Sequence, residues 1–147
     1  MFKHLLIPTD GSPIANKAVK AGIKFAKEIG AWVTAYHAVA ELLPQIYGET
    51  YVFDQQTINQ FDRNVREAGR RQGDAIGKLA KAAGVPFASV VTRTNAPHEG
   101  IIGAAKKHKC DVIFMASHGR RGLAGLLMGS VTQKVLTHSK IPVLVYR

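Results

Sequence analysis

Cysteine is almost absent from this sequence of 147 residues. The single Cys110 excludes a disulfide within the chain, and its place before an apolar run predicts a buried, unreactive thiol. No apolar run is long enough to span a bilayer, and the first residues lack the apolar core of a signal peptide. These absences predict a cytoplasmic protein. The length of 147 residues predicts one domain over residues 1–147 with a sizeable core.

Acidic residues are scarce as well: 10 Asp and Glu stand against 20 Lys and Arg, which gives a formal net charge of +10. Such an excess suits three classes of partner, namely nucleic acid, an anionic membrane surface and acidic small ligands. The basic residues are spread over helical segments and mixed with acidic ones, as in the stretch 62–74. Solvated helix faces therefore explain the charge better than a nucleic-acid surface, and we expect no membrane or nucleic-acid partner.

Several motifs with a well-understood chemistry are missing. Neither a Walker A pattern nor Gly-x-Gly-x-x-Gly occurs, which removes the main support for a P-loop protein or a dinucleotide-binding Rossmann domain. The six histidines lack the spacing of zinc ligands, and Ser117 and Ser130 lack the context of a nucleophile elbow. The sequence thus predicts no metal centre of its own and no catalytic triad.

The chain does contain a regular alternation of strands and helices. Short apolar runs at 2–7, 31–39, 87–92, 111–115 and 141–146 predict strands. Amphipathic segments predict helices over 13–29, 57–83, 97–109 and 130–138, the first with Ser12 as its N-cap and Gly30 as its end. This alternation predicts a three-layer α/β/α sandwich, in which a five-stranded parallel sheet carries helices on both faces.

The long helix over 57–83 is expected to turn an apolar stripe toward the sheet, and Gly73 and Gly77 are expected to allow close packing there. The expected inner residues are Ile58, Phe61, Val65, Ala68, Gln72, Ala75, Ile76, Leu79 and Ala83. The segment before it, 40–56, predicts a long surface connection. Its aromatic residues Tyr47, Tyr51 and Phe53 allow two interpretations, a lid over a ligand or, as we favour, a satellite hydrophobic cluster.

The stretch Met115–Thr132 has the features of an anion site. It follows an apolar strand, is spaced by glycines, and ends at Gly129-Ser130, where a helical pattern begins. Ser130 is expected to cap that helix, and Gly129 to let the backbone approach a ligand closely. Free backbone amides and the positive end of the helix dipole would then hold a phosphate group.

A second turn, Pro8–Ser12, also follows a strand. Ligands of parallel sheets bind at the carboxyl ends of the strands, where the strand order reverses. If the first and fourth strands are neighbours, the two turns line the same crevice.

These residues resemble the universal stress protein family over the whole chain. The likeness rests on four segments: Pro8-Thr9-Asp10-Gly11-Ser12, His37, Asn95-Ala96-Pro97 and Ile141-Pro142-Val143-Leu144-Val145. The nucleotide-binding branch of the family carries Gly-x2-Gly-x9-Gly-Ser/Thr. Here Gly119, Gly129 and Ser130 match this pattern, and Ala116 replaces the first glycine. Alanine suits that position if its φ angle is negative.

The resemblance implies an adenine nucleotide alpha hydrolase-like (Rossmann-like) sheet of order 3-2-1-4-5. It also implies an adenine nucleotide ligand, which is ATP, ADP or AMP, with or without Mg²⁺. By their positions in the family pattern, the residues expected to contact the adenosine and ribose are Pro8, Thr9, Asp10, Ala38, Met115 and Ala116. The residues expected to contact the phosphates are Gly119, Gly129, Ser130, Val131 and Thr132. If the strand at 141–146 lies at the sheet edge, its unpaired backbone groups can pair with a second chain. We therefore expect an antiparallel homodimer through this strand, which members of the family often form.

Four side chains near these turns allow two interpretations each. Asp10 either contacts the adenosine or a divalent ion, or caps the turn before Ser12, and the resemblance favours binding. Arg120 and Arg121 either hold phosphate oxygens or lie in solvent, and we expect at most one to engage. His118 has no evident carboxylate partner, so we expect a simple polar contact at the site rather than acid–base catalysis.

The sequence therefore predicts a stress-response protein that binds an adenine nucleotide and serves as a binding or signalling module. We identify no general base beside a water position, so any ATP hydrolysis is expected to be slow. One alternative is a nucleotide hydrolase or nucleotidyl transferase on the same fold, in which Asp10, His118 and bound magnesium are catalytic. The other is a basic protein that binds nucleic acid, against which the scattered charge argues.

Overall fold

A computed structural model describes residues 1–40, 54–119 and 128–147. Along the chain the elements are β1 (His4–Pro8), α1 (Pro13–Ile29), β2 (Trp32–Val39), α2 (Gln55–Ala83), β3 (Phe87–Arg93), α3 (Pro97–Lys107), β4 (Val112–Ala116), α4 (Ser130–His138) and β5 (Val143–Tyr146). Each predicted strand and helix is present. The aromatic residues of the predicted connection, Tyr47, Tyr51 and Phe53, lie outside the described ranges, as do Arg120 and Arg121.

The five strands form one parallel sheet in the order β3-β2-β1-β4-β5, which confirms the predicted order. The central strand β1 pairs with β2 from His4↔Trp32 to Pro8↔Tyr36, and with β4 at Leu5↔Val112. The chain winds outward from β1 in one direction and from β4 in the other. The turns that follow β1 and β4 therefore leave the same rim of the sheet side by side.

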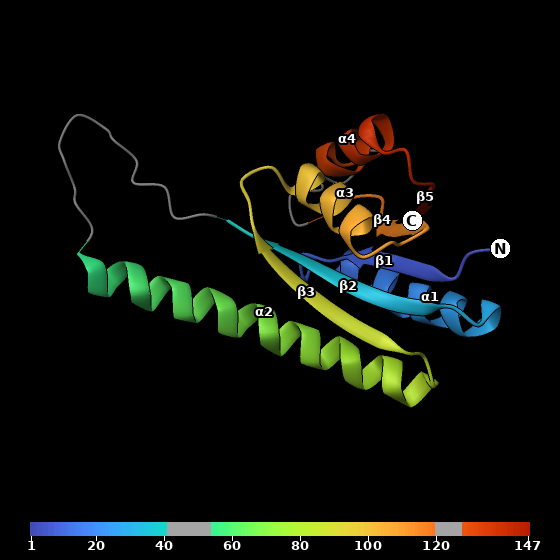
Figure 1. The fold of residues 1–147 in the computed structure, drawn as a ribbon, viewed down its shortest axis with the longest axis horizontal. Helices are drawn as coiled ribbons and strands as arrows, with labels where there is room; N and C mark the ends of the chain where they lie inside the picture. Colours follow the sequence, from blue (N-terminus) through green and yellow to red (C-terminus); the bar gives the residue numbers. More distant parts are fainter. Residues whose placement is uncertain (41–53, 120–127) are drawn as a thin grey trace.

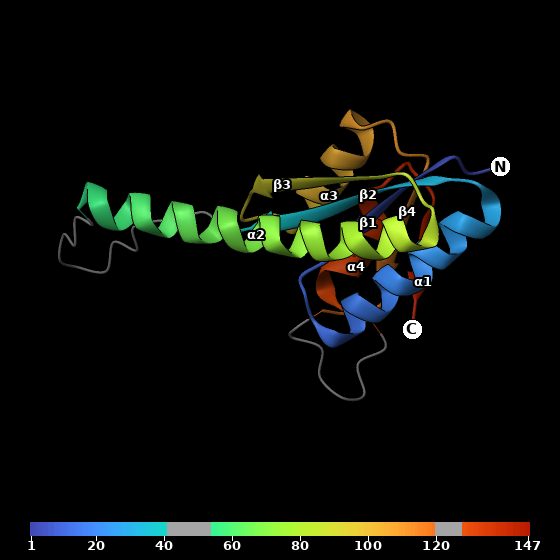
Figure 2. The same ribbon diagram turned by 90° about the horizontal axis from the view of Figure 1, so that it is seen from below.

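Helices cover both faces of the sheet (Figures 1 and 2). On one face, α1 and α2 pack over Leu5, Ile7 and Phe114. On the other, α3 and α4 cover a second core that includes Leu6 and Ile113. Neighbouring residues of one strand enter opposite cores, because side chains alternate across a β-strand. No helix in the described ranges combines the length and apolar character needed to cross a membrane.

The first helix begins and ends at the predicted residues. Ser12 has extended backbone angles, and its hydroxyl oxygen accepts a hydrogen bond from the Ala15 amide at 3.2 Å. Pro13 occupies the first turn, where its missing N–H costs nothing. Gly30 ends the helix with φ = 67°, a left-handed conformation that glycine adopts without strain.

A line of glycines brings α2 against the edge strand β3. A Cβ atom placed on Gly69, Gly73 or Gly77 would lie 3.0 Å from Val91, 2.8 Å from Ser89 or 3.2 Å from Phe87, respectively. The glycines are four residues apart on one helix face, and the contacted strand residues are two apart on one sheet face. This contact confirms the close packing expected at Gly73 and Gly77.

The predicted inner stripe of α2 is only partly correct. Ile76 is buried as expected, and Gln72 is half-buried, but Ala68 and Ala75 are exposed and Leu79 is 43% exposed. The contact face is instead centred on the glycine line, since backbone without a side chain can come closest to the strand. A count of apolar residues ignores glycine, and this is why the predicted face is rotated from the true one.

The amino rim of the sheet is closed by a carboxylate. Asp111, which precedes β4, accepts hydrogen bonds from the Lys3 amide at 2.8 Å and from the His4 amide at 3.1 Å. The start of β1 is thereby bonded to the start of β4, its neighbour in the sheet.

His4 lies buried at this rim, with 3% of the residue exposed. Its ring stacks on Trp32, and its Nε2 lies 2.8 Å from the Thr34 hydroxyl. The Cys110 sulfur lies 3.4 Å from the same nitrogen. Burial raises the pKa of the Cys110 thiol to about 12, with the nearby charge of Asp111 acting in the same direction. The prediction that Cys110 is buried is confirmed.

Candidate functional site

Two turns meet at the carboxyl rim of the sheet, as the sequence predicts for neighbouring strands. One follows β1 and contains Thr9 and Asp10; the other follows β4 and reaches Gly119. A Cβ atom on Gly119 would collide with the Asp10 carboxylate. The two turns therefore touch, and glycine is required at the point of contact.

The first turn is shaped by its own side chains. The Thr9 hydroxyl oxygen accepts a hydrogen bond from the Gly11 amide at 3.1 Å, and Asp10 Oδ1 accepts one from the Ser12 amide at 2.9 Å. Gly11 between them has φ = 76°. These are nested side-chain turns of the kind that Thr and Asp favour. Of the two interpretations of Asp10, the capping contact is present in the structure.

The second turn is held by hydrogen bonds to β5 and between its own two ends. The Ser117 amide donates to the Tyr146 carbonyl at 2.8 Å, and the Gly129 amide donates to the Ser117 carbonyl at 2.8 Å. The Thr132 hydroxyl donates to the Ala116 carbonyl at 3.0 Å. The start of α4 is thus bonded to the end of β4.

One expectation about this turn is wrong. The N-cap of α4 is Gly129, with φ = −74° and ψ = 152°, and Ser130 is the first helical residue. Because the Gly129 amide is bonded within the protein, it is not available to a ligand. A Cβ on Gly129 would lie 3.1 Å from His118 Cα. Glycine is therefore needed because the two ends of the loop approach each other here.

The amides of Ser130, Val131 and Thr132 find no acceptor among the residues that the structure describes, and the first backbone bond of α4 runs from Gln133 to Gly129 at 3.0 Å. The first amides of a helix have no partner within it, and the helix dipole makes this end positive. Ser130 is exposed. This helix start is the part of the candidate site that suits an anion.

The substitution of the first motif glycine by Ala116 fits the fold. Ala116 is the last residue of β4 and pairs with Tyr146. Of the described residues other than glycine, only Lys109 has a positive φ, so the condition set for alanine is met. Met115 and Ala116 are 5% and 7% exposed. Only the backbone and the edges of these side chains are open to a ligand.

The remaining predicted residues lie at the ends of neighbouring strands. Pro8 ends β1 and pairs with Tyr36, while Ala38 lies two residues further along β2 and is half-buried. His118 Nδ1 lies 3.0 Å from the Ser117 hydroxyl. The structure thus gathers the predicted residues at the carboxyl ends of β1, β2 and β4.

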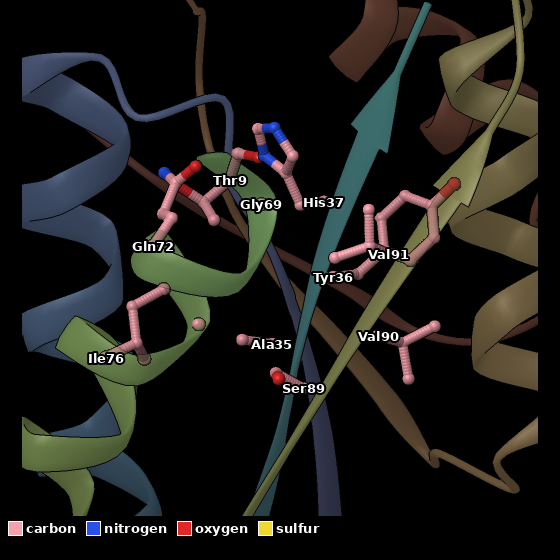
Figure 3. A pocket seen from close by; sticks show the side chains of 11 residues that line it. Thr9, Ala35, Tyr36, His37, Gly69, Gln72, Ile76, Ser89, Val90 and Val91 are labelled. Atoms are coloured by element: carbon pink, nitrogen blue, oxygen red, sulfur yellow. The ribbon is translucent and has the colours of Figure 1, made fainter. Parts of the chain in front are cut away.

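Two polar residues that contact Thr9 were not predicted as part of the site. His37 Nδ1 lies 2.8 Å from the Thr9 carbonyl oxygen, and Gln72 Nε2 donates to the Thr9 hydroxyl oxygen at 3.3 Å. Figure 3 shows both side chains converging on Thr9 from β2 and α2. A polar residue inside the predicted apolar stripe is the signal that could have identified Gln72.

This arrangement offers hydrogen-bond donors and a positive helix end to an anion. Within residues 1–40, 54–119 and 128–147, no three His, Cys, Asp or Glu side chains are placed to bind a metal ion. The chemistry supported by these residues is anion binding through backbone amides.

The whole chain, residues 1–147, matches the sequence model of the "Universal stress protein family". Universal stress protein MJ0531 of Methanocaldococcus jannaschii is 31% identical over 147 residues, which cover 100% of this chain and 83% of that protein.

Solved structures share the fold. MJ0577 of the same organism superposes with a TM-score of 0.82 at 29% identity, over 99% of this chain and 95% of that one. A universal stress protein described as a complex with cAMP gives a TM-score of 0.71 at 21% identity, over 99% and 97% of the two chains. At that identity the second likeness shows the fold alone.

Proposed function

The chain belongs to the universal stress protein family, and from this membership we propose that it binds ATP or a related adenine nucleotide at residues 116–132. The observation that carries the proposal is the group of three amides at the start of α4, which have no acceptor among the described residues. They lie at the rim where the Asp10 and Gly119 turns touch. Helix starts of this kind bind phosphate groups.

Each end of the nucleotide has proposed contacts. The phosphates accept hydrogen bonds from the amides of Ser130, Val131 and Thr132. Gly119 has no side chain, so it lets the phosphates approach these amides. Thr9, Asp10 and the backbone of Ala38 hold the adenosine, with the ribose against Met115 and Ala116. The family motif supports this assignment. The solved relative described as a cAMP complex shows that a member with this fold holds an adenine nucleotide.

The proposed role is binding and signalling in the cytoplasm, with nucleotide occupancy as the signal. Magnesium, where it accompanies the nucleotide, would be bound mainly by the phosphates, because the described residues offer no ligand cluster of their own.

Isothermal titration calorimetry with ATP tests the phosphate site. Gly129→Val is expected to abolish binding, because its side chain would displace the start of α4 from His118. Gly103→Val is the matched control, since a Cβ on Gly103 meets nothing within 4 Å. Unchanged ATP affinity in Gly129→Val would refute the assignment.

A second variant removes one amide with little change in fold. Ser130→Pro deletes a single donor at the first helical position, where proline is well tolerated, and Gly129 already has the extended angles that precede proline. We expect ATP to bind about tenfold to a hundredfold more weakly, since a bond to a charged group contributes about 1.5–3 kcal/mol. Ser130→Ala, which keeps the amide, is the control. Equal affinities in these two variants would count against the amide cradle.

We also propose a homodimer through β5. This strand lies at one edge of the sheet, and its four residues are all partly exposed. An edge strand presents unpaired backbone groups to a second chain. Sedimentation equilibrium is expected to show dimers at micromolar concentration, and a purely monomeric protein would exclude this interface.

A further inference from the structure

A narrow slot separates α2 from the sheet at the carboxyl ends of β1 and β2 (Figure 3). Thr9, His37, Gln72, Ile76 and Ser89 are among its lining residues. Its free volume of about 10 Å³ is too small for a nucleoside and close to that of one water molecule. The slot is therefore no ligand pocket, but its wall includes the proposed adenosine contact Thr9.

The amide, the carbonyl oxygen and the hydroxyl oxygen of Thr9 each form a hydrogen bond. Its amide donates to the Tyr36 carbonyl at 2.9 Å, and its carbonyl oxygen faces His37 Nδ1 at 2.8 Å. A carbonyl oxygen only accepts, so His37 Nδ1 carries the proton and donates. The hydroxyl oxygen accepts from the Gln72 side chain and from the Gly11 amide.

Gln72 is an unusual residue for its place. It lies between Gly69 and Ile76 on the helix face that packs against the sheet, where an apolar side chain would be expected. A half-buried amide costs free energy unless it is hydrogen-bonded. The glycine line brings the α2 backbone close to the sheet, so that the Gln72 amide nitrogen comes within 3.3 Å of Thr9.

The contacts of Thr9 continue into the proposed site. Its hydroxyl oxygen fixes the Gly11 amide, and the following residue, Asp10, touches Gly119 of the second turn. A chain of contacts thus runs from α2 through Thr9 and Asp10 to the turn that follows β4.

We propose that Gln72 is a positioning residue for the adenosine end of the nucleotide site. Its hydrogen bond to Thr9 holds the turn over residues 9–12 in the shape that receives the nucleoside. The proposal rests on the proposed function, and it adds α2, on the face of the sheet opposite α4, to the elements that set nucleotide affinity.

The first test uses the protein without nucleotide. Gln72→Met keeps the length of the side chain and removes the donor, so hydrogen exchange at the Gly11 and Ser12 amides is expected to rise about threefold to tenfold, as for the loss of one hydrogen bond. Gln56→Met, at an exposed position of the same helix, is the control and should leave these amides unchanged. Unchanged exchange in Gln72→Met would overturn the proposal.

The second test measures ATP affinity in a double-mutant cycle. Gln72→Met is expected to weaken binding about threefold to tenfold in the native protein. In a Thr9→Val background, which lacks the acceptor, Gln72→Met should cause no further loss. An equal loss in both backgrounds would show that Gln72 does not act through Thr9, and unchanged affinity in the single variant would also overturn the positioning role.

The two proposals fail in different ways. If the native protein binds no ATP, the proposed function is wrong, and the exchange measurement alone decides whether Gln72 orders the turn. If the native protein binds ATP and Gln72→Met binds it equally well, only the present inference is wrong.

Discussion

The two rims of the sheet differ in how their backbone amides are hydrogen-bonded. At the amino rim, Asp111 accepts two backbone amides, and the His4 ring is buried against Trp32 and Thr34. At the carboxyl rim, three amides at the start of α4 have no acceptor among the described residues. Parallel strands all point the same way, so the two rims differ in chemistry from the outset.

This difference separates stability from function. At the amino rim the polar atoms named above are bonded within the protein, except His4 Nδ1, which is buried and has no hydrogen-bond partner among the described residues. Polar groups that are bonded in this way contribute to the free energy of folding and are not available to a ligand. A rim with spare donors contributes less to folding and keeps them for a partner. Variants at the amino rim should therefore alter unfolding and leave nucleotide binding unchanged, and variants at the carboxyl rim should do the reverse.

The strongest test of this separation is His4→Ala. Loss of a buried ring leaves a cavity and an unpaired Thr34 hydroxyl, so the free energy of unfolding is expected to fall by about 3 kcal/mol in urea titrations. ATP affinity should stay within about twofold. His138→Ala, at an exposed position, is the control. A loss of nucleotide affinity in His4→Ala would show that the two rims are coupled.

A matched pair of aspartates sharpens the comparison. Asp111→Asn keeps one acceptor oxygen where two amides need one each, and should destabilise the fold by about 1–2 kcal/mol without affecting ATP affinity. Asp10→Asn keeps the oxygen that accepts from the Ser12 amide. It removes the carboxylate charge proposed to contact the adenosine, so it should weaken ATP binding about fivefold. Calorimetry and urea unfolding on both variants measure the two effects. Equal profiles for the two variants would contradict the separation.

The amino rim should also respond to acid. Burial lowers the pKa of His4, although the Asp111 charge partly opposes this shift. The unfolded chain therefore takes up the proton first, so the contribution of neutral His4 to stability is complete above about pH 6.5 and is lost as the pH falls. Below this pH, the free energy of unfolding should fall by at most about 1.4 kcal/mol for each pH unit through His4. The decrease should be smaller in His4→Gln. An equal slope in His4→Gln would assign the effect to other groups.

The smallest expected effect concerns Cys110. Its raised pKa, about 12, and its burial predict almost no reaction with a thiol reagent such as DTNB at pH 8 in the native state. Full reaction is expected after denaturation in urea. Rapid modification of the native protein would show that the amino rim opens in solution.

Local patterns predicted the elements because their causes are local. Strands and helices follow from apolar periodicity, and the ends of α1 from Ser12, Pro13 and Gly30. The strand order was expected from the family resemblance rather than from the residues alone. The predicted inner face of α2 is wrong at Leu79, which is exposed. The true contact face depends on which residues of β3 lie opposite each glycine, and the local sequence does not contain this information.

The site was harder to predict because long-range bonds decide its details. The Gly129 amide is bonded to Ser117, twelve residues earlier, so neither the cap of α4 nor the loss of this donor is visible in the local sequence. The contact of His37 with Thr9 follows from the register of β1 against β2. The motif identified single residues at the carboxyl rim. The hydrogen bonds between these residues could be found only from the three-dimensional structure.

The glycine line of α2 has a mechanical consequence. The helix runs beyond the end of β3 (Figure 1). Asp62, seven residues before Gly69, still forms an ion pair with Arg93 at the end of β3, at 2.8 Å. The helix is therefore attached to this edge strand at two places, along the glycine line and at Asp62. Only residues 55–61 extend past the ion pair, and at 1.5 Å per residue this arm is about 10 Å long. Removing the ion pair would double the length of helix that no strand supports.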